Sequence, residues 1–157
     1  MKYLLVSLLV FLTACSVKNY EQTETKIVTI KTHKFKFSDI GYLRYSGNAL
    51  ELELFMAGHV FKKITINHLI CVSDAGCITK ANFNQNYLSE AYPSNILQNI
   101  LLGHKIFQGK NYKQNAFGFT QNIANERVNI RYIVKPKVIY FKDRKNHILF
   151  RIKDIGE

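Results

Sequence analysis

The chain has 157 residues, of which 47% are hydrophobic and 13% aromatic. Such a composition supplies a core and excludes a purely disordered tether. Twenty-two Lys and Arg residues against eleven Asp and Glu give a net charge of +11. The basic residues alternate with apolar ones, as in Lys34-Phe35-Lys36-Phe37, instead of forming one patch. This pattern argues against a nucleic-acid partner and favours an anionic membrane surface.

The first element is an apolar run from Leu4 to Leu12, preceded by Lys2 and followed by small residues. A membrane-spanning helix needs about 20 apolar residues, so the run is too short to cross a bilayer. A basic residue, a short apolar region and small residues are the layout of a secretory signal peptide. The alternative is a buried N-terminal strand.

The end of this run, Leu12-Thr13-Ala14-Cys15, resembles the lipobox of bacterial lipoproteins. The resemblance implies cleavage after Ala14 and a diacylglycerol thioether on Cys15. Ser16 follows the cysteine instead of Asp, which in lipoproteins of Gram-negative bacteria implies the outer membrane, with the domain on its periplasmic face. Three acyl chains on Cys15 would exceed the two lipid signals that stable anchoring takes.

The residues after Cys15 are polar and show no periodicity as far as Lys26. They predict a leash between lipid and domain. We therefore expect a signal peptide at residues 1–14, a lipidated N-terminus with its leash at 15–26, and one domain at 27–157.

From residue 27 the apolar residues recur at every second position, as in half-buried strands. The clearest case is Leu50, Leu52 and Leu54, which alternate with Glu51 and Glu53. The first half of the domain is predicted to hold strands at 27–30, 35–37, 42–45, 50–56, 60–66, 69–72 and 78–83. A hairpin at Ser46-Gly47-Asn48 joins two of them.

Cys71 and Cys77 flank the turn-forming residues Asp74-Ala75-Gly76. Export to an oxidising compartment favours a disulfide across a hairpin. The alternative is two free thiols packed as small hydrophobic groups. Further Cys or His residues at zinc-ligand spacing are missing from the sequence, so we expect no metal site.

One segment has helical spacing instead. The residues Ile96, Leu97, Ile100 and Leu101 form one apolar stripe. Pro93 precedes it, Ser94 is a candidate N-cap and Gly103 a candidate left-handed terminator. We expect a short amphipathic helix, Ser94 to Leu102, that covers the sheet.

Strands resume at 117–123, 128–134, 137–142 and 147–153, with a break at Pro136 and a last hairpin turn at 143–146. The pattern predicts a mainly β (α+β) fold, in which an antiparallel sheet curls into a half-barrel with one short helix as its cover.

The segment Tyr92-Pro93-x-x-Ile96-Leu97-x-x-Ile100-Leu101-x-Gly103 resembles the helix of LolB-type outer-membrane lipoproteins, which are related in fold to LolA and LppX-like proteins. The resemblance implies a half-barrel whose hydrophobic concavity holds acyl chains. The tryptophans usual in LolB are missing, because this chain has no Trp.

Motifs of catalysis are missing from the sequence. None of the five histidines has a second ligand at helical spacing, and no Gly-x-Ser-x-Gly or phosphate-binding Gly-rich loop occurs. Glu51 and Glu53 share one strand face, where two carboxylates are usually solvated. We expect neither enzymatic activity nor a cofactor.

Two functions remain open. In the first, the half-barrel binds lipid or lipoprotein acyl chains in a localisation or transfer role. Its expected lining, which includes the helix stripe, is Leu50, Leu52, Leu54, Ile96, Leu97, Ile100, Leu101, Phe117, Phe119, Ile130 and Tyr132. In the second, these side chains fill a closed core, and the protein is a structural or assembly lipoprotein that docks an envelope protein complex.

Overall fold

The computed structural model describes residues 21–156, which form a single mainly β unit with one antiparallel sheet. The strands of the first half are β1 (Gln22–Lys31), β2 (Lys36–Ser46), β3 (Ala49–Met56), β4 (His59–Ile66), β5 (Leu69–Val72) and β6 (Gly76–Thr79). Those of the second half are β7 (Tyr112–Asn115), β8 (Gly118–Ala124), β9 (Asn129–Lys135), β10 (Val138–Asp143) and β11 (Ile148–Asp154). Between the halves lie the helices α2 (Lys80–Tyr87) and α3 (Ile96–Leu102) and a 3-10 turn, η2 (Phe107–Gly109). The prediction of a mainly β antiparallel fold is confirmed.

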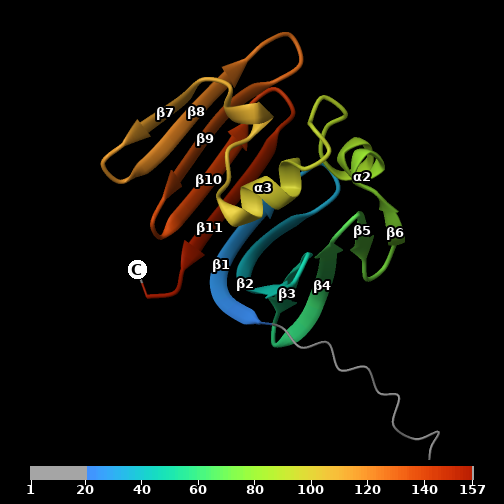
Figure 1. The fold of residues 1–157 in the computed structure, drawn as a ribbon. Helices are drawn as coiled ribbons and strands as arrows, with labels where there is room; N and C mark the ends of the chain where they lie inside the picture. Colours follow the sequence, from blue (N-terminus) through green and yellow to red (C-terminus); the bar gives the residue numbers. More distant parts are fainter. Residues whose placement is uncertain (1–20, 157) are drawn as a thin grey trace, which may run out of the picture.

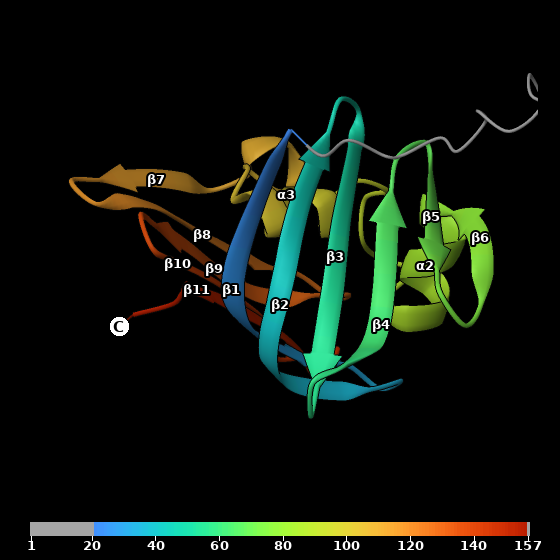
Figure 2. The ribbon, with the colours of Figure 1, turned by 90° about the horizontal axis from the view of Figure 1, so that it is seen from below.

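The sheet is one continuous meander in which the first strand pairs with the last. The strand order is β6-β5-β4-β3-β2-β1-β11-β10-β9-β8-β7, so β1 and β11 join the two halves. The sheet is strongly curved, and both helices lie on its concave side (Figures 1 and 2). Its two edges, β6 and β7, are not paired with each other, and the sheet is therefore open.

The core lies between the concave side and the helices. Leu50, Leu52 and Leu54 of β3 are fully buried there, as are Phe141 and Phe150 of the second half. Strand side chains alternate between the two faces of a sheet, so the apolar alternation seen in the sequence becomes the inner layer.

Helix α3 is short and apolar on one side. Its stripe of Ile96, Leu97, Ile100 and Leu101 is buried against the sheet. It ends at Gly103, whose left-handed conformation (φ 67°) lets the N–H of His104 reach the carbonyl of Asn99 at 2.8 Å. The predicted terminator is confirmed, but the N-cap is Asn95 rather than Ser94, and Asn95 makes no side-chain capping bond.

A second helix was not predicted. Residues 78–83 were expected to form one strand, but β6 ends at Thr79 and α2 begins at Lys80. The Thr79 hydroxyl accepts a hydrogen bond from the N–H of Asn82 at 3.2 Å and caps the helix. Phe83 then packs into the core. The prediction of a single helix is therefore wrong.

The sheet begins earlier than the predicted domain boundary at residue 27. Residues 22–26 pair with β2, and Gln22 lies opposite Tyr45. They belong to β1 and not to a polar leash. The predicted signal peptide and Cys15 lie outside the described residues.

The two remaining cysteines form a disulfide. Cys71 and Cys77 lie directly opposite each other on β5 and β6, with their Cα atoms 3.9 Å apart. The predicted bond across a hairpin is confirmed, and the free-thiol alternative is wrong for this structure.

Strand β7, which the sequence pattern did not indicate, forms a hairpin with β8. This hairpin needs a glycine at the first position of β8. A Cβ on Gly118 (φ 139°) would lie 2.0 Å from the carbonyl oxygen of Val134 on β9, so the close approach excludes any side chain. Strand β8 starts at Gly118, and Phe117 lies in the turn before it.

Candidate functional site

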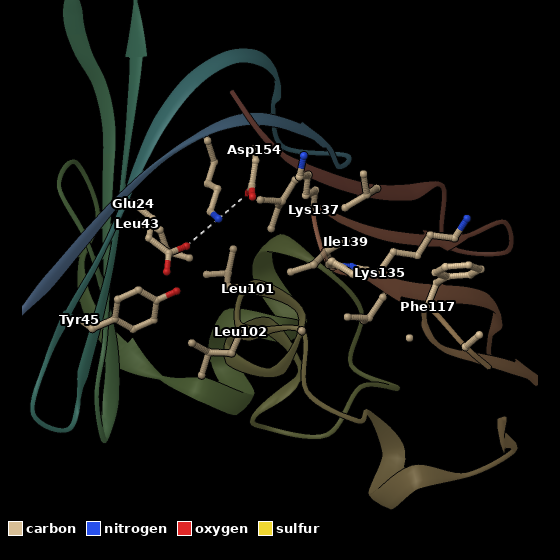
Figure 3. Close-up of a pocket in the computed structure, with 18 residues that line it drawn as sticks. Glu24, Leu43, Tyr45, Leu101, Leu102, Phe117, Lys135, Lys137, Ile139 and Asp154 are labelled. Carbon is tan, nitrogen blue, oxygen red and sulfur yellow. Dashed lines mark hydrogen bonds and ion pairs between the residues drawn. The ribbon is translucent and has the colours of Figure 1, made fainter. Parts of the chain in front are cut away.

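One cavity among the described residues has a volume of about 600 Å³ and lies at one end of the curved sheet (Figure 3). Four structural parts meet around it: strands β1 and β2, the last turn of α3, the β7–β8 and β9–β10 turns, and the end of β11. Its lining is Glu24, Lys26, Leu43, Tyr45, Leu101, Leu102, Gly103, Ala116, Phe117, Gly118, Val134, Lys135, Pro136, Lys137, Val138, Ile139, Ile152 and Asp154. The cavity therefore exists only because the curved sheet brings its two halves together around α3.

The floor and walls of the cavity are largely apolar. Leu101 and Leu102 face it from α3, Leu43 from β2 and Ile139 from β10 (Figure 3). A Cβ at Gly103 would lie 3.1 Å from the Val134 side chain. The end of the helix thus packs tightly on β9 and β10 and fixes the depth of the cavity.

A charged cluster crosses the cavity where the first and last strands pair. The Lys26 Nζ lies 2.6 Å from a Glu24 carboxylate oxygen and 2.6 Å from an Asp154 carboxylate oxygen (Figure 3). Burial would lower the pKa of Lys26, but hydrogen bonds to Asp154 and Glu24 outweigh that effect and raise the pKa. The lysine stays charged, and the cluster holds β1 to β11 beside the apolar wall.

The phenol of Tyr45 faces the same space from β2 (Figure 3). Burial and the nearby Glu24 carboxylate raise the pKa of Tyr45. The hydroxyl therefore stays protonated and is a hydrogen-bond donor at the cavity wall.

The rim on the opposite side carries an exposed aromatic residue beside cations. Phe117 is 72% exposed, the highest value among the large hydrophobic residues described. Lys135 and Lys137 flank Pro136 in the β9–β10 turn, and both are exposed. A partly apolar wall, with charged groups both across the cavity and at its rim, is chemically suited to an amphiphile.

Most of the predicted lining residues lie elsewhere. Of the eleven, Leu101 and Phe117 line this cavity. Leu50, Leu52, Leu54, Ile96, Leu97, Ile100, Ile130 and Tyr132 are buried in the core, and Phe119 packs against it. Under the helices, a void next to Leu97, Phe83 and Phe150 measures only about 10 Å³. Side chains therefore fill the centre of the concave side, and the open space is at its end.

Tyr132 positions the helix that forms the cavity floor. Its hydroxyl donates to the carbonyl oxygens of His104 (3.0 Å) and Asn99 (3.3 Å), just where α3 ends. Burial raises the pKa of this phenol above its ordinary value. The residue thus ties the end of α3 and the residue after its glycine terminator to β9.

Sequence patterns did not point to Glu24, Lys26 or Asp154. Lys26 and Asp154 are 128 positions apart and meet only because β1 pairs with β11. Nothing in the local sequence distinguishes these three charged residues from solvated ones.

The interpretation of Glu51 as a solvated carboxylate is wrong. Glu51 is only 1% exposed. It lies 3.1 Å from the Arg44 guanidinium and 2.9 Å from the Lys63 ammonium. Glu53 also pairs with Arg44, so both carboxylates belong to an ion-pair network on the side of the sheet away from the cavity.

In residues 21–156 no three His, Cys, Asp or Glu side chains gather as metal ligands. The same part of the chain has no helix that is long and apolar enough to cross a bilayer. Comparison of the chain with protein-family models, curated proteins and solved structures finds no match.

Proposed function

We propose that the chain is a lipid-anchored envelope protein that binds the acyl chains of lipids or lipoproteins. In this proposal Cys15 carries the lipid, the domain faces the periplasm at the outer membrane, and the curved sheet acts as a half-barrel with α3 as an internal cover. Its role is that of a LolB-like lipoprotein, in localisation or transfer, with neither catalysis nor a nucleic-acid partner.

The cavity at the end of the sheet carries this proposal. Its volume of about 600 Å³ falls within the range of about 300–1,000 Å³ that is typical of small-molecule sites. Leu102, Val134 and Ile139, which are half-buried, offer an apolar surface to an acyl chain. Lys135 and Lys137 at the rim suit an anionic headgroup outside it.

A second candidate is a structural or assembly lipoprotein without a ligand, which docks an envelope protein complex. The filled centre of the concave side favours it, because nine of the eleven expected lining residues lie in a packed core. The two candidates differ in one observable property, which is whether the purified protein holds acyl chains in its cavity.

Native mass spectrometry of the full chain with extracted lipids tests the proposal. We expect bound lipid in addition to the covalent anchor. Leu102→Trp places a larger side chain in the cavity from a half-buried position on α3, and it should abolish that signal. Leu69→Trp, at a half-buried position on β5 that does not line the cavity, is the matched control. Full lipid binding by Leu102→Trp, or its absence from the unaltered protein, would leave the assembly role as the better explanation.

A further inference from the structure

Cations gather on the outer face of the sheet. The strands that meet at the β1–β11 junction have buried residues at alternate positions, including Ile130, Tyr132, Phe141, Phe150 and Ile30. The residues between them therefore point outward. Six of these outward side chains, which we call the basic face, are Lys31, Lys36, Arg131, Lys142, Arg151 and Lys153.

The cations of this face are placed next to one another. Lys142 lies directly opposite Arg131, and Lys31 lies directly opposite Lys36. Leu149 is the cross-strand partner of both Lys142 and Lys31, so all four cations belong to one row across the sheet. Like charges directly opposite each other destabilise a sheet. The row therefore costs folding stability that an anionic partner would restore.

Carboxylates do not neutralise this face. At the outward positions of β1, β2, β9, β10 and β11 there is no Asp or Glu. None of the six cations is in an ion pair with another described residue. The neighbouring outer face of β3 and β4 is different, because Glu51 and Glu53 are paired there with Arg44 and Lys63. Positive charge is thus segregated on one region of the surface.

The shape of the face favours a membrane over a linear polyanion. The cations are spread over five adjacent strands, on the side of the sheet that is convex in Figure 1. Two of them, Lys31 and Lys142, line one hollow of about 410 Å³, and the other four lie outside it. The same face exposes two apolar side chains, Ile27 (36%) and Ile40 (40%). Ile27 lies directly opposite both Ile40 and Lys153. Apolar groups among cations suit the boundary between headgroups and acyl chains.

We propose that the basic face docks on a bilayer of anionic phospholipids and orients the domain on it. If Cys15 is the lipid anchor of the proposed function, the chain from Cys15 to the start of β1 at Gln22 reaches at most about 25 Å, so the sheet is held close to the headgroups. Lys135 points outward from β9 and also lines the cavity rim. Docking would therefore bring the mouth of the cavity to the membrane surface.

A fluorescence experiment on the full chain tests this orientation. The sequence has no Trp, so Tyr140→Trp is a single reporter at an outward, half-buried position between Arg151 and Ile133. Tyr87→Trp on α2 is the reporter for the helix side. The protein is inserted into vesicles of phosphatidylcholine, alone or mixed with anionic phosphatidylglycerol, and brominated lipid serves as the quencher.

We expect quenching of the Tyr140→Trp reporter in the mixed vesicles and little in phosphatidylcholine, with the Tyr87→Trp reporter unquenched in both. Arg131→Glu with Lys142→Glu keeps a like-charge pair but reverses its sign. Since each cation near an anionic surface contributes about fivefold, the ratio of docked to undocked protein should fall at least about 25-fold. Lys105→Glu with Lys110→Glu, two exposed cations between α3 and β7, should leave it unchanged.

The proposal is overturned if both reporters are quenched equally, if the Tyr140→Trp reporter is unaffected by anionic lipid, or if the two double variants behave alike. It is also overturned if Arg131→Glu with Lys142→Glu weakens binding of a DNA duplex at physiological salt but leaves the vesicle quenching intact. Flotation with phosphatidylcholine vesicles reports the covalent anchor alone, and lipid in native mass spectra reports the cavity. These two measurements distinguish a missing anchor or an empty cavity from a failure of the basic face. The basic face should bind anionic vesicles even without the anchor.

Discussion

Replacement of Asp143 should remove the hydrogen bonds that attach the segment before α3 to the last hairpin. Asp143 is fully buried at the end of β10. One carboxylate oxygen accepts hydrogen bonds from the Tyr92 hydroxyl (2.7 Å) and the Asn146 side-chain amide (2.7 Å). The other accepts from the N–H groups of Asn129 and Lys145, both at 3.0 Å. The residue therefore joins the turn after α2 to two strands of the second half.

The size of the effect follows from these bonds. Hydrogen bonds to a charged group contribute about 1.5–3 kcal/mol each, but bonds that share one acceptor group are not additive. We expect Asp143→Ala to lower the free energy of unfolding by about 3 kcal/mol. At roughly 3–4 °C per kcal/mol for a domain of this size, the melting temperature should fall by about 10 °C.

A double-mutant cycle with Tyr92→Phe isolates one bond. Tyr92→Phe alone should lower the free energy of unfolding by about 1.5 kcal/mol. In the Asp143→Ala background the same substitution should lower it by much less, because the acceptor of the bond is already missing. Urea unfolding followed by circular dichroism measures all four proteins. Fully additive losses would refute the direct hydrogen bond, and a loss below about 1 kcal/mol for Asp143→Ala would refute the role of the network.

The same network has a defined pH dependence. Burial would raise the pKa of Asp143, but hydrogen bonds from Asn146, the Asn129 N–H and Tyr92 outweigh it and lower the pKa. The stabilisation is therefore fully present above the unfolded pKa of about 3.9 and is lost as the pH falls through the folded value. The difference in stability between the unaltered protein and Asp143→Ala should be constant near neutral pH and shrink below about pH 4. A difference that grows on acidification would contradict this assignment.

Other predictions concern the anchor, the disulfide and the helix. Cys15→Ala should abolish incorporation of a palmitate analogue, and unchanged labelling would exclude lipidation there. Reduction of the Cys71–Cys77 bond should lower the free energy of unfolding by only about 2 kcal/mol in urea titrations, since the loop it closes is small; two thiols alkylated without reductant would show that the bond is not formed in the envelope. Leu97→Asp, in the packed core, should unfold the domain in thermal melts, whereas Leu101→Asp should also impair fatty-acid binding because Leu101 borders the cavity. Intact stability and binding in both would show that α3 is not a cover.

The sequence by itself determined those features that depend on neighbours along the chain. Alternation in Leu50, Leu52 and Leu54 indicated strand β3, because side chains of a strand point alternately to its two sides. Gly103 indicated the end of α3, because glycine adopts the left-handed conformation at little energetic cost. The turn between Cys71 and Cys77 indicated the disulfide partners, because a tight turn places the residues on its two sides opposite each other.

The tertiary structure decided what depends on distant parts of the chain. Helix α2 has little apolar periodicity, and it is held by the Thr79 cap and by Phe83 in the core. Glu51 is buried because Arg44 and Lys63 on the neighbouring strands neutralise it. The packed centre and the open end of the concave side both arise from the curvature of the sheet, which sets how far its two halves stand from α3. That distance is the sum of many small strand twists, and no local pattern of residues encodes it.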